Sequence, residues 1–209
     1  MALITAAEAR DYIRGLSGSA EDTLLGLLID RVGAAFGRYC AFPPAAAGGA
    51  ATLEQTTYTR YLDGPGGNTL QLSVRPTLSV TSIHDSVDRT YTSTDLIASG
   101  DYEVFGTDGI VVLKTTGATS GFSEGYRAIK AVYSAGYSTV PDDIKHAACL
   151  QVKWWYEGRD VVGFRSVSQT GGNVSMGASL AKGAGGPLQL LGECREVLQP
   201  YRLTGPWIA

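Results

Sequence analysis

Residues 126–156 read YRAIKAVYSAGYSTVPDDIKHAACLQVKWWY, and their hydrophobic pattern changes from that of a strand to that of a helix. Over residues 126–133 the side chains alternate between two faces, with Tyr126, Ala128, Lys130 and Val132 on one and Arg127, Ile129, Ala131 and Tyr133 on the other. Gly136 breaks this strand. Pro141 then opens a helix, because a missing N–H is tolerated at the first helical position. The stretch therefore predicts a β region joined directly to a helical region.

The helix predicted over residues 141–156 has a polar start and an apolar side. Asp142 and Asp143 fall in its first turn, where carboxylates interact favourably with the positive end of the helix. The side chains expected along the buried side are Ile144, Ala147, Ala148, Gln151 and Trp155, broadened by Leu150 and Trp154. We interpret the aspartates as helix-start residues and the tryptophans as core. A catalytic carboxylate pair and an aromatic platform for bases or sugars are the alternatives.

Two helices are predicted before the β region. Thr5 and Glu8 form a capping-box pattern that starts the first helix. A second helix is expected over residues 20–39, and prolines at positions 43 and 44 prevent its continuation. Its apolar face is predicted to consist of Leu25, Leu28, Val32, Phe36 and Tyr39.

The second helix also carries a stripe of glycines, Gly26, Gly33 and Gly37, distinct from its apolar face. Each glycine costs roughly 1 kcal/mol relative to alanine in a helix interior. Close approach of another helix or subunit would explain the stripe, and we treat these residues as possible subunit-packing positions. Simple tolerance of glycine at an exposed surface is the alternative.

The middle of the chain has the alternation and turn signals of β structure. Strands are predicted over residues 57–62, 69–74, 78–83, 102–105, 110–113 and 126–133. The predicted fold class is α+β: a small helical bundle with an inserted antiparallel β domain and an extended C-terminal segment. The expected parts are N-terminal bundle helices at 1–44, the β domain at 53–134, the main helix at 139–160, a flexible loop at 161–186, and a C-terminal helix and tail at 187–209.

The C-terminal segment is a candidate partner-binding surface. A helix is predicted over residues 188–198, ended by Pro200, and the tail after it is unusually apolar. Exposed aromatic groups near a terminus are costly unless covered, and tryptophan is a favoured interface anchor. We expect contacts to a partner molecule or a neighbouring subunit from Leu188, Leu191, Leu198, Tyr201, Trp207 and Ile208. The alternative is that the tail folds back on its own chain.

Composition limits the class of protein. The chain has 209 residues, of which 44% are hydrophobic and 18% charged, as expected for a folded protein with a substantial core. A net charge of −3 argues against an electrostatic grip of the whole molecule on nucleic acid. Three widely spaced cysteines favour free, buried thiols in a reducing compartment. No secretory leader or membrane span is evident, so we expect a cytoplasmic protein unless it joins an assembly.

Motifs for catalysis or metal binding are missing from the sequence. Neither His84 nor His146 has a metal-ligand spacing, and neither a nucleophile elbow nor a phosphate-binding loop occurs. We therefore predict no catalytic, cofactor-binding or metal-binding residue and no enzyme activity. An enzyme of unrecognised type, using His84, Asp142 or Asp143, is a rival hypothesis.

Five motifs taken in order resemble the head–tail connector (adaptor) proteins of tailed bacteriophages. They are residues 3–13 (LITAAEARDYI), 75–83 (RPTLSVTSI), 101–113 (DYEVFGTDGIVVL), 132–137 (VYSAGY) and 140–147 (VPDDIKHA). Their order and spacing cover roughly residues 3–160, whereas the segment after Gly158 matches poorly.

The resemblance implies a structural role in the virion, at the head–tail interface, with assembly in the host cytoplasm. It implies a ring, usually of twelve subunits, that docks on the portal protein and extends the channel for double-stranded DNA without binding it specifically. The ring would offer a platform to the next connector, stopper or tail protein, and the C-terminal segment would embrace the portal. No cofactor or membrane partner is implied. The alternative is an oligomeric binding module whose β insert recognises a protein or glycan.

Overall fold

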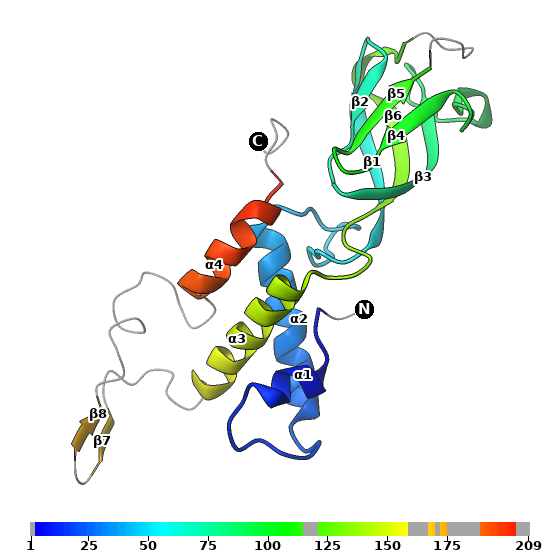
Figure 1. The fold of residues 1–209 in the computed structure, drawn as a ribbon. Coiled ribbons are helices and arrows are strands. Elements are labelled where there is room, and N and C mark those ends of the chain that lie inside the picture. The colour runs from blue at the N-terminus through cyan, green and yellow to red at the C-terminus, as the bar shows by residue number, and fades with distance from the viewer. Residues whose placement is uncertain (1–2, 115–120, 159–166, 170–171, 175–188, 204–209) are drawn as a thin grey trace. The chain divides into compact units, whose positions relative to one another are not determined.

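The computed structural model describes residues 3–114, 121–158, 167–169, 172–174 and 189–203. The chain separates into two compact units (Figure 1). The helical unit comprises Ala2–Ala35 and Pro141–Pro200, and the β unit comprises Phe36–Val140 and the chain from Tyr201 onward. Helices come first, antiparallel strands follow, and helices return, which confirms the predicted α+β class.

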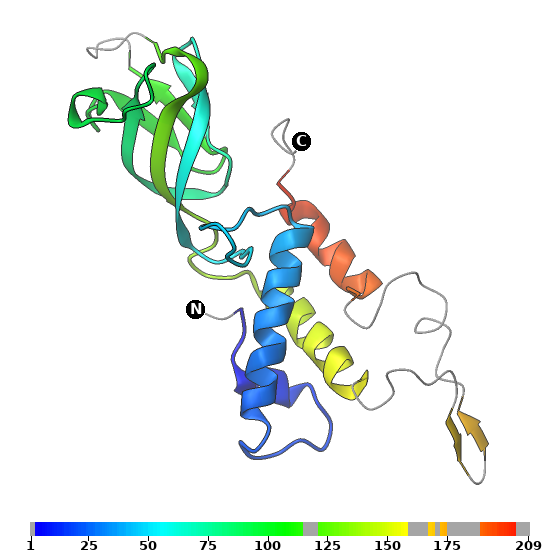
Figure 2. The same ribbon diagram turned by 180° about the vertical axis from the view of Figure 1, so that it is seen from behind.

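The helical unit contains α1 (Ala6–Asp11), α3 (Asp142–Gly158), α4 (Gly192–Leu198) and the part of α2 (Asp22–Tyr39) that precedes Phe36. Helix α4 lies along α3, as Figures 1 and 2 show from opposite sides. The core is built from the faces predicted for α2 and α3. Its buried side chains include Leu25, Leu28, Ile29, Val32, Ile144, Ala147, Ala148, Val152, Trp155, Cys194 and Leu198. None of the described helices is both long and apolar enough to cross a membrane.

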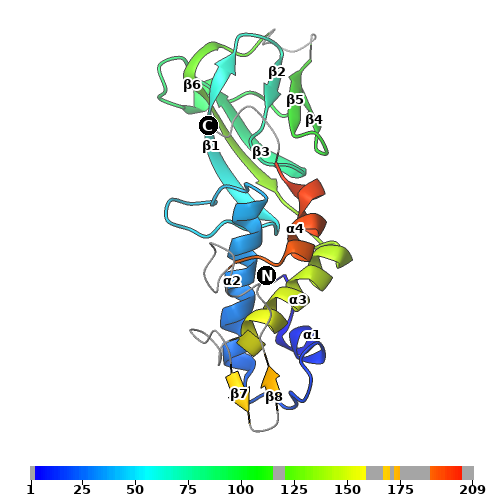
Figure 3. The same ribbon diagram turned by 90° about the vertical axis from the view of Figure 1, so that its left-hand side faces the viewer.

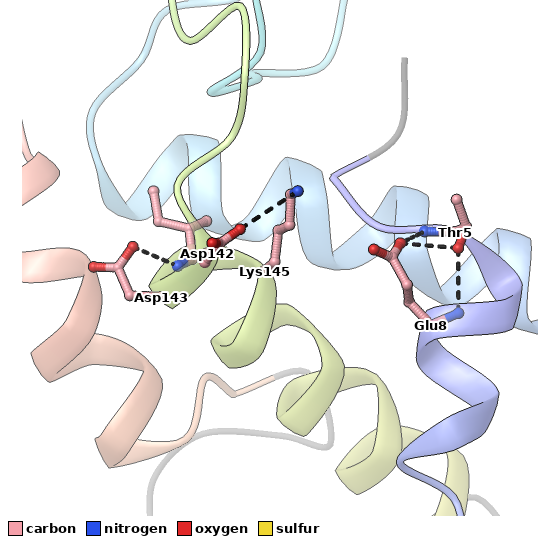
Figure 4. Close-up of polar contacts among 6 residues, drawn as sticks. Thr5, Glu8, Asp142, Asp143 and Lys145 are labelled. Atoms are coloured by element: carbon pink, nitrogen blue, oxygen red, sulfur yellow. Dashed lines mark hydrogen bonds and ion pairs between the residues drawn. The ribbon is translucent and has the colours of Figure 1, made fainter.

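Both predicted helix starts are present (Figure 4). In α1, the Glu8 backbone N–H donates to the Thr5 hydroxyl at 3.2 Å, and the Thr5 N–H donates to the Glu8 carboxylate at 2.6 Å. The bond from the Thr5 N–H, followed by one that the Thr5 hydroxyl donates to the same carboxylate at 2.8 Å, lowers the pKa of Glu8. In α3, Asp143 accepts from the Ile144 N–H at 2.8 Å, and Asp142 lies 3.6 Å from the Lys145 ammonium. The aspartates are thus local helix-start residues.

The buried face of α3 differs from the prediction at two positions. Trp155 is buried, but Leu150 and Trp154 are only half-buried, and Cys149 and Val152 contribute to the core instead. Successive helical residues point about 100° apart, so Trp154 is turned away from the face that Val152 and Trp155 share.

The β unit consists of two three-stranded antiparallel sheets (Figure 3). One has the order β1–β6–β3, formed by Thr56–Pro65, Glu124–Ala135 and Thr77–Asp85, and the other has the order β2–β5–β4, formed by Thr69–Gln71, Ile110–Leu113 and Tyr102–Phe105. The strand predicted over 69–74 is too long, because the Leu72 N–H donates to Gly109 in a turn rather than extending the ladder. Its alternation was nevertheless correct, since Leu70, Leu72 and Val74 are all buried.

Two tyrosines form the centre of this unit. Tyr58 and Tyr133 lie opposite each other on β1 and β6, with ring centroids 5.9 Å apart and both side chains fully buried. Burial raises the pKa of Tyr58 to about 12. Gly136 ends β6 with a φ of +101°, and a Cβ there would lie 2.5 Å from the Glu54 carbonyl oxygen. The strand break predicted at Gly136 is therefore imposed by a close backbone approach.

The alternation predicted for residues 126–133 is correct only in its second half. Ile129, Ala131 and Tyr133 are buried, whereas Arg127 is exposed although it was placed on their face. The β1–β6 register shifts between Leu62 and Gly64, and Arg127 takes a φ of +53° within this irregularity. A bulge redirects side chains in this way, so Arg127 points outward.

The chain after α3 also departs from the prediction. The C-terminal helix expected over 188–198 begins only at Gly192, because Leu191 is its extended N-cap residue. Within the loop predicted over 161–186, a hairpin pairs β7 (Val167–Gln169) with β8 (Gly172–Val174). The rest of that loop lies outside the described residues.

Candidate partner-binding surfaces

The polar residues considered for catalysis belong to different units, with Asp142, Asp143 and His146 in the helical unit and His84 in the β unit. His146 is exposed, and its Nδ1 lies 2.8 Å from the Tyr12 hydroxyl within the helical unit. His84 belongs to the β unit, where its Nδ1 is buried and has no hydrogen-bond partner. Among the residues described, no group of three or more His, Cys, Asp or Glu side chains could hold a metal ion. Binding surfaces are consequently the features to consider.

Helix α4 is anchored to α3 by specific polar contacts. The Leu191 N–H donates to the Gln151 side-chain oxygen at 2.9 Å, and the Gln151 amide donates to the Gln189 carbonyl at 3.3 Å. The Cys194 thiol donates to the Ala147 carbonyl at 3.3 Å. Leu198, expected to contact a partner, is instead fully buried in the core of the helical unit, and Leu191 is half-buried. The exposed residues of this segment are Gly192, Glu193, Glu196, Gln199 and Pro200.

Residues 201–203 pack on their own chain. The Tyr201 ring meets Tyr137 edge-on with centroids 5.7 Å apart, and the Arg202 guanidinium lies 5.3 Å from the Tyr39 ring centroid. The Leu203 N–H donates to the Cys40 carbonyl at 2.9 Å. The fold-back alternative is therefore correct for these three residues. Leu188, Trp207 and Ile208 lie outside the described residues.

The three glycines of α2 have different surroundings. A Cβ on Gly37 would lie 2.6 Å from the Ala51 carbonyl, so this glycine is required by close packing within the β unit. A Cβ on Gly33 would make an ordinary 3.7 Å contact with Leu3, and one on Gly26 would meet nothing within 4 Å. Of the stripe, only Gly26 is open to a contact from another molecule.

The sequence interpretation missed a cluster of exposed tyrosines and arginines in the β unit. Tyr61, Arg89, Tyr91, Tyr126 and Arg127 line a pocket of about 340 Å³, which we call the Tyr–Arg pocket. They come from β1, the loop after β3 and the start of β6, so they form no linear motif. One signal was available: a charged Arg127 does not fit the apolar face on which the alternation placed it.

Comparison with models of known protein families shows which family the chain matches. A model of the head completion protein family matches residues 2–180, which is most of the chain. The chain belongs to the head completion protein family. The resemblance to head–tail connector proteins that the five motifs suggested is thereby confirmed. The match ends before α4, so the C-terminal surface lies beyond the part that defines this family.

Solved structures show the same fold as this head completion protein. A chain from the "Neck of empty GTA particle computed with C6 symmetry" is 17% identical, with a TM-score of 0.57 over 99% of this chain and 93% of that one. A chain from the "Neck of native GTA particle computed with C12 symmetry" is 14% identical, with a TM-score of 0.55 over 98% and 91%. At such low sequence identities, the structural similarity shows only that these chains share a fold. No curated protein sequence matches.

Proposed function

We propose that this head completion protein is a structural, non-enzymatic head–tail connector. Twelve copies form a ring that docks on the portal protein, continues the DNA channel and provides the platform for the next connector, stopper or tail protein. The observation that carries this proposal is the family match over residues 2–180, supported by a likeness to neck chains that extends over nearly the whole fold.

The charge of the protein suits passage of DNA without retention. Double-stranded DNA binds proteins chiefly by exchanging its counterions for lysine and arginine side chains. A chain with 17 lysines and arginines against 20 aspartates and glutamates offers no net attraction to phosphate. A ring of such subunits would let the duplex slide.

The portal-docking surface is proposed to begin at α4 and continue through the tail. The buried Leu198 and Cys194 hold α4 in the helical unit, while Tyr201, Arg202 and Leu203 anchor the following residues on the β unit. These internal contacts leave residues 204–209, which include Trp207 and Ile208, as the apolar portion to test for portal binding. Leu188 remains a proposed contact. Tyr201 is more simply an anchor for the tail.

Truncation after Leu203 tests the docking proposal without removing core residues. This variant retains α4 and the contacts of Tyr201 and Leu203, so far-ultraviolet circular dichroism should match that of the full chain. We expect it to lose binding to purified portal rings in sedimentation experiments, and Trp207→Ala/Ile208→Ala should behave similarly. Val87→Ala, which truncates a side chain that is 68% exposed in the β unit, is the matched control. Undiminished portal binding by the truncated protein would contradict the proposal that the tail binds the portal.

A further inference from the structure

Aromatic rings and cationic groups contact one another in and beside the Tyr–Arg pocket. The Arg127 guanidinium lies 5.3 Å from the Tyr61 ring centroid, and the rings of Tyr61 and Tyr91 are 5.2 Å apart. The Lys130 ammonium lies 5.8 Å from the Tyr91 ring centroid. Cations over aromatic faces are held in a limited range of positions. The positive groups are thus fixed beside the pocket rather than extended into solvent.

Hydrogen bonds hold the backbone beneath these side chains. The Tyr91 hydroxyl donates to the Arg127 carbonyl at 2.6 Å, and the Arg127 N–H donates to Asp63 at 2.7 Å. The buried Ser86 hydroxyl accepts from the N–H groups of Thr90 and Tyr91, both at 3.2 Å. Such preorganisation lowers the entropy that a bound ligand must overcome.

Three residues of the pocket have a left-handed backbone. Arg89, Tyr91 and Arg127 have φ values of 63°, 51° and 53°, and the described part of the chain has only one other non-glycine residue of this kind, Ala41. Such conformations are unfavourable for residues with a Cβ and concentrate at functional sites. Their coincidence around one pocket is a second, independent indication of a binding site.

The cations in and beside the pocket have no ion-pair partner within the part of the chain that the structure describes. They are Arg89, Arg127 and Lys130. A planar guanidinium presents paired N–H donors that match a carboxylate, and adjacent tyrosine rings cover the apolar part of such a side chain. We propose that the Tyr–Arg pocket binds an aspartate or glutamate side chain presented by an extended segment of a protein partner.

The surroundings favour an acidic protein segment over nucleic acid. Asp88 immediately precedes Arg89, and hydrogen bonds from Ser86 and then Thr90 lower its pKa, so that it stays charged. Asp63 is exposed next to Arg127. These carboxylates disfavour the dense row of phosphates on a duplex more than they disfavour a single carboxylate. All the groups belong to the β unit, so the inference does not depend on ring formation.

Titration of the full-length protein with model peptides tests this inference. The probe is a flexible peptide of alternating glutamate and glycine, and its comparison has glutamine in place of glutamate. We expect the acidic peptide to bind at millimolar concentration with an affinity that falls as salt rises, and the glutamine peptide not to bind. Arg89→Gln/Arg127→Gln should weaken binding roughly tenfold or more. The control variant Arg14→Gln/Arg31→Gln removes the same charge from exposed positions of the helical unit, and it should bind the peptide as the wild type does.

Four results would overturn the inference. They are no binding of the acidic peptide to folded protein, equal binding of the glutamine peptide, equal loss of binding in the control variant, or no loss in the pocket variant. A duplex DNA of twenty base pairs and a neutral glycan are titrated in parallel. Stronger binding of either one, abolished by the pocket variant, would assign the pocket to that ligand instead.

Discussion

The side chain of Gln151 on α3 accepts a hydrogen bond from the backbone N–H of Leu191, the N-cap residue of α4, although the two residues lie 40 positions apart in sequence. Gln151 is fully buried, and its amide also reaches the Gln189 carbonyl. A single buried amide thus satisfies both a donor and an acceptor of the segment leading into α4. The position of α4 in the helical unit depends on this polar contact as well as on apolar packing.

Gln151→Ala should therefore destabilise the protein. The substitution leaves the Leu191 N–H and the Gln189 carbonyl without their partner, at a cost of about 1–3 kcal/mol in the free energy of unfolding. Urea denaturation followed by circular dichroism measures this. Glu157→Ala, at an exposed position of the same helix, is the control and should change stability by less than about 0.5 kcal/mol. Equal stability of the two variants would show that the amide contributes little.

Gly37→Ala and Gly26→Ala should have opposite effects on the isolated chain. The new Cβ at Gly37 would meet the Ala51 carbonyl at 2.6 Å, so we expect a loss of about 1–3 kcal/mol from overpacking. The Cβ at Gly26 meets nothing, so the higher helix propensity of alanine should stabilise by up to about 1 kcal/mol. Thermal denaturation of both variants gives the comparison.

The variant Gly26→Ala also tests whether Gly26 lies between subunits. If another copy packs closely there, Gly26→Ala should reduce ring formation on the portal while leaving the isolated chain more stable. Ring formation that is unaffected by this substitution would assign Gly26 to an exposed surface.

The three thiols should be unreactive in the folded protein. Burial raises the pKa of Cys40 to about 12 and those of Cys149 and Cys194 to about 11. A thiol reagent at pH 8 should therefore label none of them without denaturant and all three in denaturant, as mass spectrometry would show. Rapid labelling of a thiol under native conditions would indicate that its surroundings open readily.

Stability should decline at alkaline pH for the same reason. Below the pKa of about 9 of an unfolded cysteine, both states carry the proton and stability does not change with pH. Between that value and the raised pKa values of the folded thiols, only the unfolded state releases protons, so the folded state loses stability. Each thiol contributes up to about 1.4 kcal/mol per pH unit in that window. Denaturation midpoints that stay constant from pH 7 to pH 10 would contradict this.

Tyr91→Phe should weaken peptide binding to the Tyr–Arg pocket while preserving the fold. The substitution keeps the ring between Tyr61 and Lys130 but removes the hydrogen bond to the Arg127 carbonyl. Loss of one such bond corresponds to a decrease in affinity of about fivefold. Tyr12→Phe, which removes a hydrogen-bonded hydroxyl from the helical unit and not from the pocket, is the matched control. Equal affinity of Tyr91→Phe and wild type would show that the hydroxyl does not position Arg127.

Features that depend on neighbouring residues were predictable from the sequence. The capping box of Thr5 and Glu8 and the carboxylates that start α3 arise from local backbone chemistry. The break at Gly136 was predicted from the glycine itself, although the Glu54 backbone that requires it is distant in sequence. The main strands and the buried faces of α2 and α3 follow from hydrophobic period, which burial of apolar surface enforces. The family resemblance rests on the same segments.

Features that depend on distant residues were not predictable. The register irregularity beside Leu62 determines where Arg127 points, and no local pattern encodes a pairing between strands so far apart. Gln151 appeared to belong to an apolar stripe because its partners, Gln189 and Leu191, follow a long intervening segment. The late start of α4 has the same cause.

Mass measurement of the purified protein mixed with its portal rings tests the connector assignment most directly. We predict a discrete complex whose mass exceeds that of the portal by one complete ring of 22.0 kDa chains, with twelve copies expected. The full-length protein should bind in this stoichiometry even if it is monomeric alone. A protein that stays monomeric and adds no mass to the portal would contradict the assignment.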